Sequence, residues 1–285
     1  MQNEKGEGDY LNMQKNQYEA PVPPEAVVGN YPWHEEYPYE TFLLFKNGDV
    51  RKPIFDTFND KVALDFACGP GRMVKRMRRL FKKVDGCDIS SRLLREAERY
   101  CKPHSGGENP TVGGGIKSDF YLTNGNDLGA VPQNFYDYIY CTISMQHIAS
   151  HAIREKILSS MFAALKVGGK ITLQMAYNPR APFAYELPDV VHVGTMLEIR
   201  VFTRLQGADY LSDDFNATST NGGHDVLIGK KDLANVKADL SKKFSNVTLW
   251  FSNISNYLND LNGQVHQQYW ATDWIYLHGE KSSSS

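Results

Sequence analysis

A turn that contains two glycines between a strand and a helix constrains this chain more than any other feature. The stretch LDFACGPGRMVKRM, Leu64 to Met77, begins as an apolar strand, passes through Gly69 and Gly71, and continues with the apolar spacing of a helix. Glycine lets the backbone approach a ligand without a Cβ in the way, and the helix behind it offers free N–H groups. The stretch therefore predicts a ligand site at this strand–helix turn.

Strand and helix patterns alternate on both sides of that turn. The apolar, β-prone runs are KVALDFA, KVDGCDI, SDFYLT, YDYIYCTIS and KITLQMAY. Between them, helices are expected from about Arg72 to Phe81, after an N-cap at Ser90 or Ser91, and from about 153 to 165, where KVGG supplies a glycine stop. Right-handed crossovers then give an α/β fold with a doubly wound, mostly parallel sheet of the Rossmann-like kind.

Two more runs, SNVTLWFS and YWATDWIYLHGE, follow a helical pattern near the C-terminus. They predict an antiparallel hairpin at the edge of the sheet, which makes seven strands in all. A segment rich in Pro, Gly, Asp and Asn interrupts the alternation after the fifth strand. This segment is interpreted as an insertion over the ligand edge of the sheet.

Composition excludes several classes of protein. The 285 residues are 41% hydrophobic and carry a formal net charge of −2, which disfavours a general nucleic-acid or membrane-surface binder. No apolar run reaches the roughly 18 residues of a membrane span, and the polar N-terminus lacks a signal-peptide pattern. The four cysteines lack metal-ligand spacing, so a reduced, cytoplasmic protein is expected. The sequence leaves the oligomeric state open, and a dimer is compatible with it.

Three nucleotide ligands compete for the glycine turn. A phosphate-binding loop needs G-x-x-x-x-G-K-[ST], which the sequence lacks, and a dinucleotide site needs a third glycine where Val74 stands. S-adenosylmethionine sites carry acid-x-G-x-G-x-G, and Asp65 to Gly71 reads D-F-A-C-G-P-G. Asp88, which ends the second strand, can accept hydrogen bonds from both hydroxyls of a ribose. The pattern favours S-adenosylmethionine.

At these residues the chain resembles the class I S-adenosylmethionine-dependent methyltransferases. VALDFACGPGR, VDGCDIS, FYDYIYCTISMQHI and ALKVGGKITLQM are similar to four motifs of that family, in the same order. The resemblance covers roughly residues 60 to 177 and 230 to 280. The chain departs from the family at Ala67, which replaces the first glycine, and at Tyr136, which stands inside the usual F-D pair.

The resemblance implies a role for each matching residue. Asp65 is expected near the methionine amino group, Asp88 on the ribose hydroxyls and Ile89 against the adenine, with either Asn126 or Asp127 near the adenine amino group. Thr142 to Gln146 would line the side of methyl transfer. The implied cofactor-binding residues are Asp65, Ala67, Cys68, Gly69, Gly71, Asp88, Ile89, Asn126, Asp127 and Thr142.

His147 is the first candidate for a general base, because an imidazole can take a proton from an acceptor hydroxyl near neutral pH. A purely structural role for His147 stays open. His192 and His224 in the insertion are weaker candidates for a base, and no metal is expected. The expected substrate-side residues are Trp33, His34, Tyr37, Tyr39 and Gln146.

The predicted function is an enzyme that transfers a methyl group from S-adenosylmethionine, leaving S-adenosylhomocysteine, to the oxygen of a small polar acceptor. A sugar, a nucleotide-linked sugar or a secondary metabolite fits this description, and nucleic acid and membrane partners are not expected. TISM stands where enzymes that methylate amide or base nitrogens carry N-P-P-Y. Three alternatives stay open: N-methylation of a small amine, a non-catalytic module that binds adenosyl ligands, and a nicotinamide oxidoreductase, which Val74 disfavours.

The expected organisation has five parts. Residues 1 to about 20 are expected to be loose, and the aromatic stretch from Pro21 to Pro53 to be an ordered arm. The parts are an N-terminal arm or cap over the active site (1–58), a cofactor-binding core (59–177), a substrate-side insertion (178–228), a C-terminal helix with edge strands (229–280) and a disordered tail (281–285).

Overall fold

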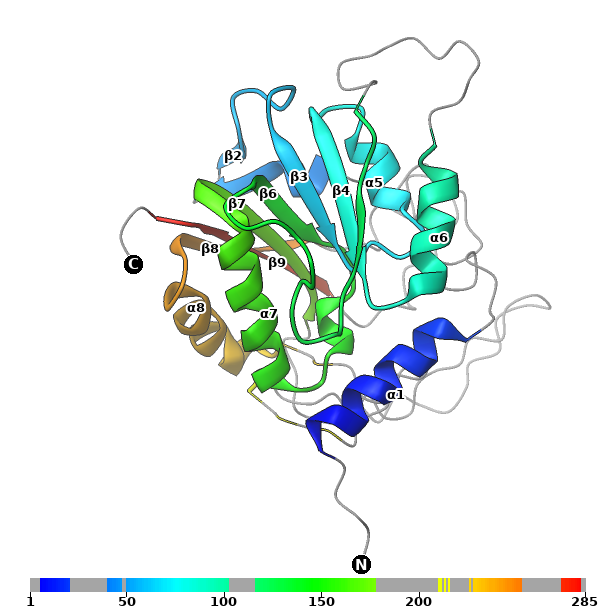
Figure 1. Cartoon of the computed structure of the whole chain (residues 1–285). Helices are drawn as coiled ribbons and strands as arrows, with labels where there is room; N and C mark the ends of the chain where they lie inside the picture. The colour runs from blue at the N-terminus through cyan, green and yellow to red at the C-terminus, as the bar shows by residue number, and fades with distance from the viewer. Residues whose placement is uncertain are drawn as a thin grey trace, which may run out of the picture.

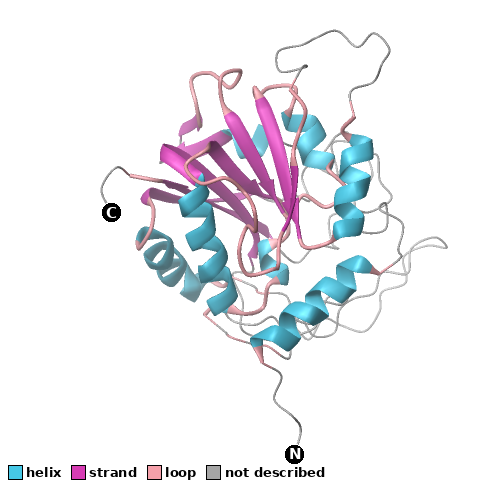
Figure 2. Ribbon diagram, viewed as in Figure 1, coloured by secondary structure: helices cyan, strands magenta, loops and turns pink. Residues whose placement is uncertain are grey.

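A seven-stranded sheet with helices on both faces organises the described part of the chain (Figures 1 and 2). The computed structural model describes residues 6–20, 40–47, 50–102, 116–177, 210–211, 213, 215, 226, 228–252 and 273–282. The strands of this sheet are β3 (Val62–Phe66), β4 (Lys83–Asp88), β5 (Phe120–Leu122), β6 (Tyr136–Cys141), β7 (Leu165–Tyr177), β8 (Ser245–Ser252) and β9 (Asp273–Glu280). A separate hairpin comprises β1 (Leu44–Asn47) and β2 (Val50–Pro53).

The order of the strands is β5-β4-β3-β6-β7-β9-β8. The pairs from β5 to β7 are parallel, whereas β9 is antiparallel to both β7 and β8. The predicted doubly wound, mostly parallel, seven-stranded sheet with an edge hairpin is confirmed. Because the chain runs outward in one direction from β3 to β5 and in the other from β6 to β7, a crevice is expected between β3 and β6, at their carboxyl ends.

Helices cover the sheet in two layers. The helices are α1 (Glu7–Glu19), α4 (Glu40–Leu43), α5 (Arg72–Met77), α6 (Ser91–Tyr100), α7 (His151–Ala164) and α8 (Leu233–Ser241), with 3₁₀ turns η1 (Met145–His147) and η2 (Lys230–Asp232). Apolar residues of α1, α7 and α8 pack in one core, and those of α4, α5 and α6 pack in a second core. Ser90, one of the two predicted candidates, is the N-cap of α6, and its hydroxyl accepts from the Leu93 amide.

Two predicted element boundaries are wrong. Helix α5 ends at Met77, and beyond it the amides of Arg79 and Leu80 donate to the carbonyls three residues before them, as in a turn. Phe81 is still fully buried, and its ring stacks on Tyr138, so its apolar character does not depend on helical structure. A buried apolar residue in a turn can continue the apolar spacing of the helix before it, so the sequence pattern alone does not show where the helix ends.

The predicted glycine stop at Gly168 and Gly169 also fails. Helix α7 ends at Ala164, and both glycines belong to β7. Their backbones pair with Lys281, since Gly168 donates to the Lys281 carbonyl at 2.7 Å and the Lys281 amide donates to Gly169 at 2.8 Å. Lys281, which was expected in a disordered tail, is buried, and its Nζ donates to the Leu165 carbonyl at 2.7 Å. These glycines therefore pair with the residue that follows β9 and do not terminate α7.

Helix α1 corrects the expectation that the first 20 residues are loose. Tyr10 and Gln14 are buried, and the Tyr10 hydroxyl accepts a hydrogen bond from the Ala149 amide at 2.7 Å. The Gln14 side chain donates to the His147 carbonyl at 3.4 Å. The polar side chains of this segment hydrogen-bond to backbone groups of other elements, which a pattern of polar letters does not reveal.

We expect Tyr10→Phe to lower the free energy of unfolding by about 1–3 kcal/mol, because the buried Ala149 amide loses its acceptor. Urea denaturation monitored by circular dichroism measures this change. Asn12→Ala, at an exposed position of the same helix, is the matched control and should change the free energy by less than about 0.5 kcal/mol. Equal stability of Tyr10→Phe and the wild type would contradict the docking of α1.

Candidate functional site

The loops that follow four neighbouring parallel strands form one edge of the sheet. They follow β3, β4, β5 and β6, which are consecutive in the order of the sheet. All ten predicted cofactor-binding residues lie in or beside these loops: Asp65, Ala67, Cys68, Gly69, Gly71, Asp88, Ile89, Asn126, Asp127 and Thr142. The topology therefore brings residues that are far apart in the sequence to one place.

The glycine turn between β3 and α5 adopts left-handed backbone conformations. Ala67, Gly69 and Gly71 have φ angles of 57°, 52° and 86°. A Cβ on Gly71 would lie 3.0 Å from the side chains of Ala97 and Cys101, so α6 packs directly against this glycine. A Cβ on Gly69 would meet nothing within 4 Å, so the turn faces open space there. Gly71 serves packing, and Gly69 leaves room for a ligand.

Asp88 fixes the glycine turn to the end of β4. Its Oδ2 accepts from the Gly69 amide at 2.9 Å, and its Oδ1 accepts from the Ser90 amide at 2.9 Å. Burial raises the pKa of Asp88, and the amides of Ser90 and Gly69 oppose that rise. A carboxylate has about four lone-pair sites, so both oxygens keep acceptor capacity for a ligand.

Asp65 is a buried carboxyl group on β3, with 2% of the residue exposed. Burial raises its pKa well above the usual value; the positive charge of Arg72 opposes this rise, and the negative charge of Asp88 adds to it. A buried carboxylate is costly unless a cation or hydrogen-bond donors compensate it. The position of Asp65 beside the open glycine turn therefore suits a ligand with a positive charge.

The loop after β5 uses most of its polar groups internally. The carboxylate of Asp127 accepts from the Gly129 amide at 2.7 Å and from the Asn124 side chain at 3.1 Å. The Asn126 amide group donates to Glu7 of α1 at 3.1 Å. Asp127 thus shapes the turn, while Asn126 connects it to α1.

Ile89 packs against the same loop. A Cβ on Gly125, whose φ is 97°, would lie 2.7 Å from Ile89 Cδ1 and 3.0 Å from a methyl group of Leu11. The absence of a side chain at Gly125 lets Ile89 and α1 approach each other. The apolar wall of the site therefore includes a residue of α1.

Two buried polar groups follow β6. Thr142 and Gln146 are 8% and 2% exposed. Within the described part of the chain, no group hydrogen-bonds to the Thr142 hydroxyl or to the side-chain oxygen of Gln146. Ile143 between them has a φ of 54°, a conformation that costs energy for a β-branched residue. Orphaned polar atoms at the edge of the sheet suit a polar ligand.

A family model described as a methyltransferase domain matches residues 63–169, which run from β3 into β7. This part of the chain is therefore similar to a methyltransferase domain. The match includes the glycine turn, the end of β4 and the loop after β6. The resemblance to class I S-adenosylmethionine-dependent methyltransferases, drawn from the motifs, is confirmed.

A ubiquinone/menaquinone biosynthesis C-methyltransferase of Wigglesworthia glossinidia brevipalpis is 25% identical over 131 residues, which are 46% of this chain and 49% of the relative. The chain thus matches about half the length of that relative.

Two solved structures share the fold. Geranyl diphosphate C-methyltransferase from Streptomyces coelicolor has a TM-score of 0.55 and 13% identity, covering 95% of this chain and 97% of the other. Phosphoethanolamine N-methyltransferase 2 of Haemonchus contortus has a TM-score of 0.53 and 15% identity, covering 98% of this chain and 61% of the other. At these identities the likeness concerns the fold alone.

Helix α1 lies against three loops of the methyltransferase domain and was missed in the sequence. The carboxylate of Glu19 accepts from the amides of Ser91 at 2.6 Å and Arg92 at 3.3 Å, which are the free N–H groups of α6. The Ser90 hydroxyl donates to the Tyr18 carbonyl at 3.0 Å. With the contacts to Asn126 and to η1, α1 touches the loops after β4, β5 and β6. The spacing of Tyr10, Met13, Gln14, Gln17 and Tyr18, which is that of one helix face, was the available signal.

His147 ends the 3₁₀ turn after β6 and is half-buried. Its backbone carbonyl accepts from Tyr10 and Gln14 of α1, each at 3.4 Å, and its amide donates to Ser144 at 3.0 Å. These bonds fix the backbone of the candidate base. Its neighbour Gln146 accepts, through its carbonyl, from the Val226 amide at 2.8 Å.

Several other sequence predictions concern residues outside the described ranges: His192, His224, Trp33, His34, Tyr37 and Tyr39. All four cysteines are described, buried and free, as expected. Among the helices described here, none has the length and apolar character needed to cross a bilayer.

We expect Asp65→Asn to stabilise the protein against urea, and more so at pH 8 than at pH 4. Burial raises the folded-state pKa of Asp65, so the wild type loses stability as the pH climbs from the usual pKa of an aspartate through the folded-state pKa, whereas asparagine does not ionise. Asp60→Asn is the control, because Lys61 lowers the pKa of that exposed carboxyl and reverses the sign. If the gain in the free energy of unfolding from Asp65→Asn stays constant or falls as the pH rises, burial does not raise the pKa of Asp65.

Proposed function

We propose that this protein is a methyltransferase that uses S-adenosylmethionine to methylate a small polar molecule. The observation that carries the proposal is the glycine turn held by Asp88 beside the buried carboxyl of Asp65, within a methyltransferase domain. A left-handed turn and a buried carboxyl group both lower the stability of the folded protein when no ligand is bound. A ligand that contacts the turn and pairs with the carboxyl group offsets this cost.

The residues present fit S-adenosylmethionine. Asp88 retains lone pairs for two ribose hydroxyls, and Asp65 can pair with the ammonium of the methionine part. Ile89 offers an apolar contact for the adenine, and Gly69 leaves space beside the turn. When bound, the cofactor supplies a methyl carbon activated by a positively charged sulfur.

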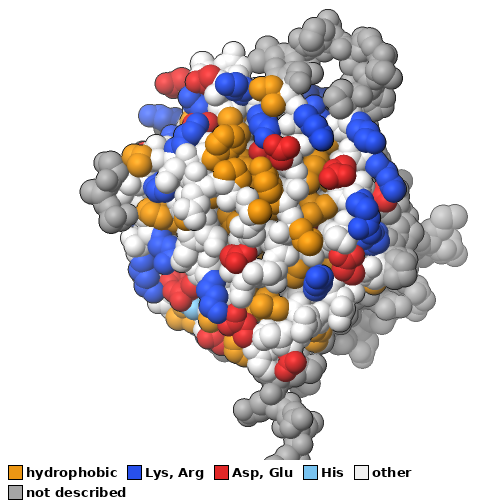
Figure 3. All heavy atoms as spheres, viewed as in Figure 1, with side chains coloured by type: hydrophobic (Ala, Val, Ile, Leu, Met, Phe, Trp, Pro, Cys, Tyr) orange, Lys and Arg blue, Asp and Glu red, His pale blue; other side chains and the backbone are white. Residues whose placement is uncertain are grey.

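Polar groups beyond β6 suit a polar acceptor. The Thr142 hydroxyl and the Gln146 amide oxygen are buried and have no partner in the described chain, and the Tyr140 hydroxyl shares this property. On the face drawn in Figure 3, basic and acidic side chains are interspersed among the described residues rather than gathered in one basic surface. Together with the net charge of −2, this distribution favours a small molecule over nucleic acid.

Transfer to an oxygen is the reaction that we favour. A hydroxyl acceptor must lose its proton as the new carbon–oxygen bond forms, and the His147 imidazole is the candidate that would take it. Tyr10 and Gln14 would keep the backbone of His147 in place. A small amine is the runner-up acceptor, because a neutral amine uses its own lone pair and does not depend on a base at His147.

Calorimetric titration tests the cofactor. We expect the purified chain to bind S-adenosylmethionine and S-adenosylhomocysteine but not NAD, and Asp88→Asn to weaken both by about 10- to 100-fold through loss of charge-assisted hydrogen bonds. Asp60→Asn, an exposed change of the same type, should bind like the wild type. If neither adenosyl ligand binds, the proposed function is wrong.

Release of S-adenosylhomocysteine tests the acceptor. Sugars, nucleotide-linked sugars, hydroxylated secondary metabolites and small amines are offered in turn. With a hydroxyl acceptor, we expect His147→Asn to lower kcat by about 10²- to 10⁴-fold while cofactor affinity stays unchanged. Full activity of His147→Asn on an amine would favour N-methylation. Cofactor binding without turnover on any acceptor would instead favour a non-catalytic binding module.

A further inference from the structure

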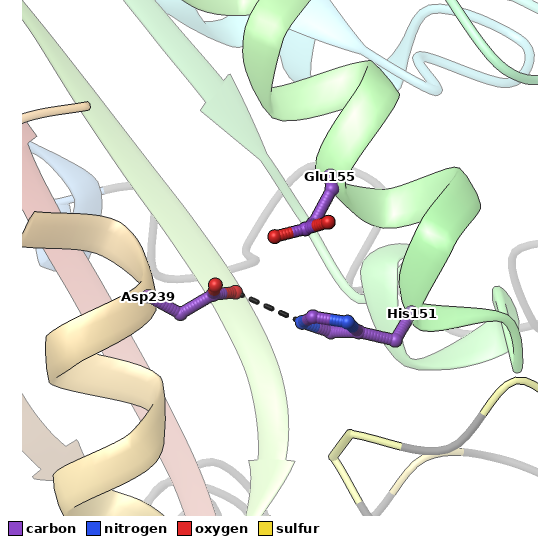
Figure 4. Close-up of side chains that lie close together, drawn as sticks. All are labelled: His151, Glu155 and Asp239. Carbon is purple, nitrogen blue, oxygen red and sulfur yellow. Dashed lines mark hydrogen bonds and ion pairs between the residues drawn. The ribbon is translucent and has the colours of Figure 1, made fainter. Parts of the chain in front are cut away.

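A second cluster of chemically competent side chains lies between α7 and α8. His151 and Glu155 are four residues apart on α7, so they share one helix face, and Asp239 projects from α8 opposite them (Figure 4). One ligand atom from each residue lies within 4.8 Å of the other two. The pair of His151 Nε2 and Asp239 Oδ2 is separated by 3.0 Å.

We propose that His151, Glu155 and Asp239 bind one divalent transition-metal ion, with Zn²⁺ as the reference ion. One imidazole nitrogen and two carboxylate oxygens form a three-ligand set that such ions accept, with water in the remaining position. Ligands about 2.0–2.2 Å from Zn²⁺ lie about 3.2–3.6 Å apart in a tetrahedron. The three ligand atoms lie within 4.8 Å of one another, and an inward movement of Glu155, whose side chain is 41% exposed, would bring them to this spacing.

The charges around the cluster favour a cation. Two carboxylates face one lysine, since Lys242 Nζ lies 2.9 Å from Asp239 Oδ1 and 3.7 Å from Glu155 Oε1. The two carboxylates and the lysine together carry one excess negative charge. The side chain of Lys242 is 62% exposed and can turn into solvent, so a divalent ion can replace it and bring the set to neutrality.

Hydrogen bonds orient the buried ligand Asp239. Its Oδ1 accepts from Lys242 Nζ at 2.9 Å, and its Oδ2 lies 3.0 Å from His151 Nε2. The Tyr210 hydroxyl donates to Asp239 Oδ2 at 2.9 Å, as outer-shell partners of ligating carboxylates do. Arg154 of α7 donates to the Tyr210 carbonyl and lies over the Tyr210 ring.

An ion at this place would connect three parts of the chain. It would tie α7 to α8 and, through Asp239, hold Tyr210, a described residue of the segment between β7 and α8. Asp213 from the same segment accepts from the Ala152 amide at 2.7 Å and from the Ser150 hydroxyl at 2.9 Å at the start of α7. The site would thus be structural, and the inference does not rest on the proposed methyl transfer.

The full chain, freed of metal by a chelator and dialysed, is titrated with Co²⁺ while its visible absorption is recorded. We expect one Co²⁺ per chain, displacement by Zn²⁺, and a higher melting temperature with Zn²⁺. His151→Ala and Glu155→Gln should each weaken binding at least about tenfold, as loss of a ligand does. Lys242→Ala should tighten binding, because it removes the competing cation.

Glu98→Gln, an exposed change on α6, is the matched control and should bind Co²⁺ like the wild type. Circular dichroism of each variant establishes that it is folded. Absence of Co²⁺ binding by both the wild type and Lys242→Ala would overturn the proposal and leave an ion-pair network. Binding that His151→Ala and Glu155→Gln do not weaken would also overturn it, because the ion would then lie elsewhere.

Discussion

The carboxylate of Asp88 is the interaction on which the candidate site depends. Its two oxygens accept from the amides of Gly69 and Ser90, and they thereby join the turn after β3 to the start of α6. Gly71 then lets α6 pack against that turn, since any side chain there would meet Ala97. At the resulting edge of the sheet, Gly69 has free space beside it, and the Asp88 carboxylate can still accept hydrogen bonds from a ligand. Both are properties of a nucleoside-binding site.

Helix α1 makes the N-terminus part of this site. Glu19 caps α6, Tyr10 accepts from the backbone after β6, and Glu7 binds both Asn126 and Lys156. Apart from the contact with Lys156 on α7, each of these contacts joins a polar side chain of α1 to a group at the carboxyl edge of the sheet. A segment with few apolar residues is therefore held by hydrogen bonds to three loops, in addition to the packing of Tyr10 in the core. The loops after β4, β5 and β6 are thereby held by one element.

Two buried aspartates illustrate how surroundings decide the state of a carboxyl group. Burial dominates at Asp65 and raises its pKa, because Arg72 compensates the negative charge only in part. At Asp239 the hydrogen bonds from Lys242, His151 and Tyr210 prevail over burial and lower the pKa. The first arrangement suits a cationic ligand that completes the compensation. The second surrounds a carboxylate with three hydrogen-bonding side chains between two helices, where the proposed divalent ion would take the place of the lysine.

The sequence by itself determined the alternation of strands and helices, the glycine turn with its two acids, an N-cap at Ser90 or Ser91 and the edge hairpin. All of these depend on periodicity or on residues close together in the chain, where local sterics and hydrogen bonding decide the outcome. Only the tertiary structure decided that the N-terminal segment is a helix, that Gly168 pairs with Lys281, and that His151 meets Asp239, 88 residues away. These features depend on residues that are far apart in the sequence and meet only in the folded protein, so the local sequence around each residue does not predict them. The same limit applies to the site, where the motifs identified its residues and the order of the strands placed them at one edge.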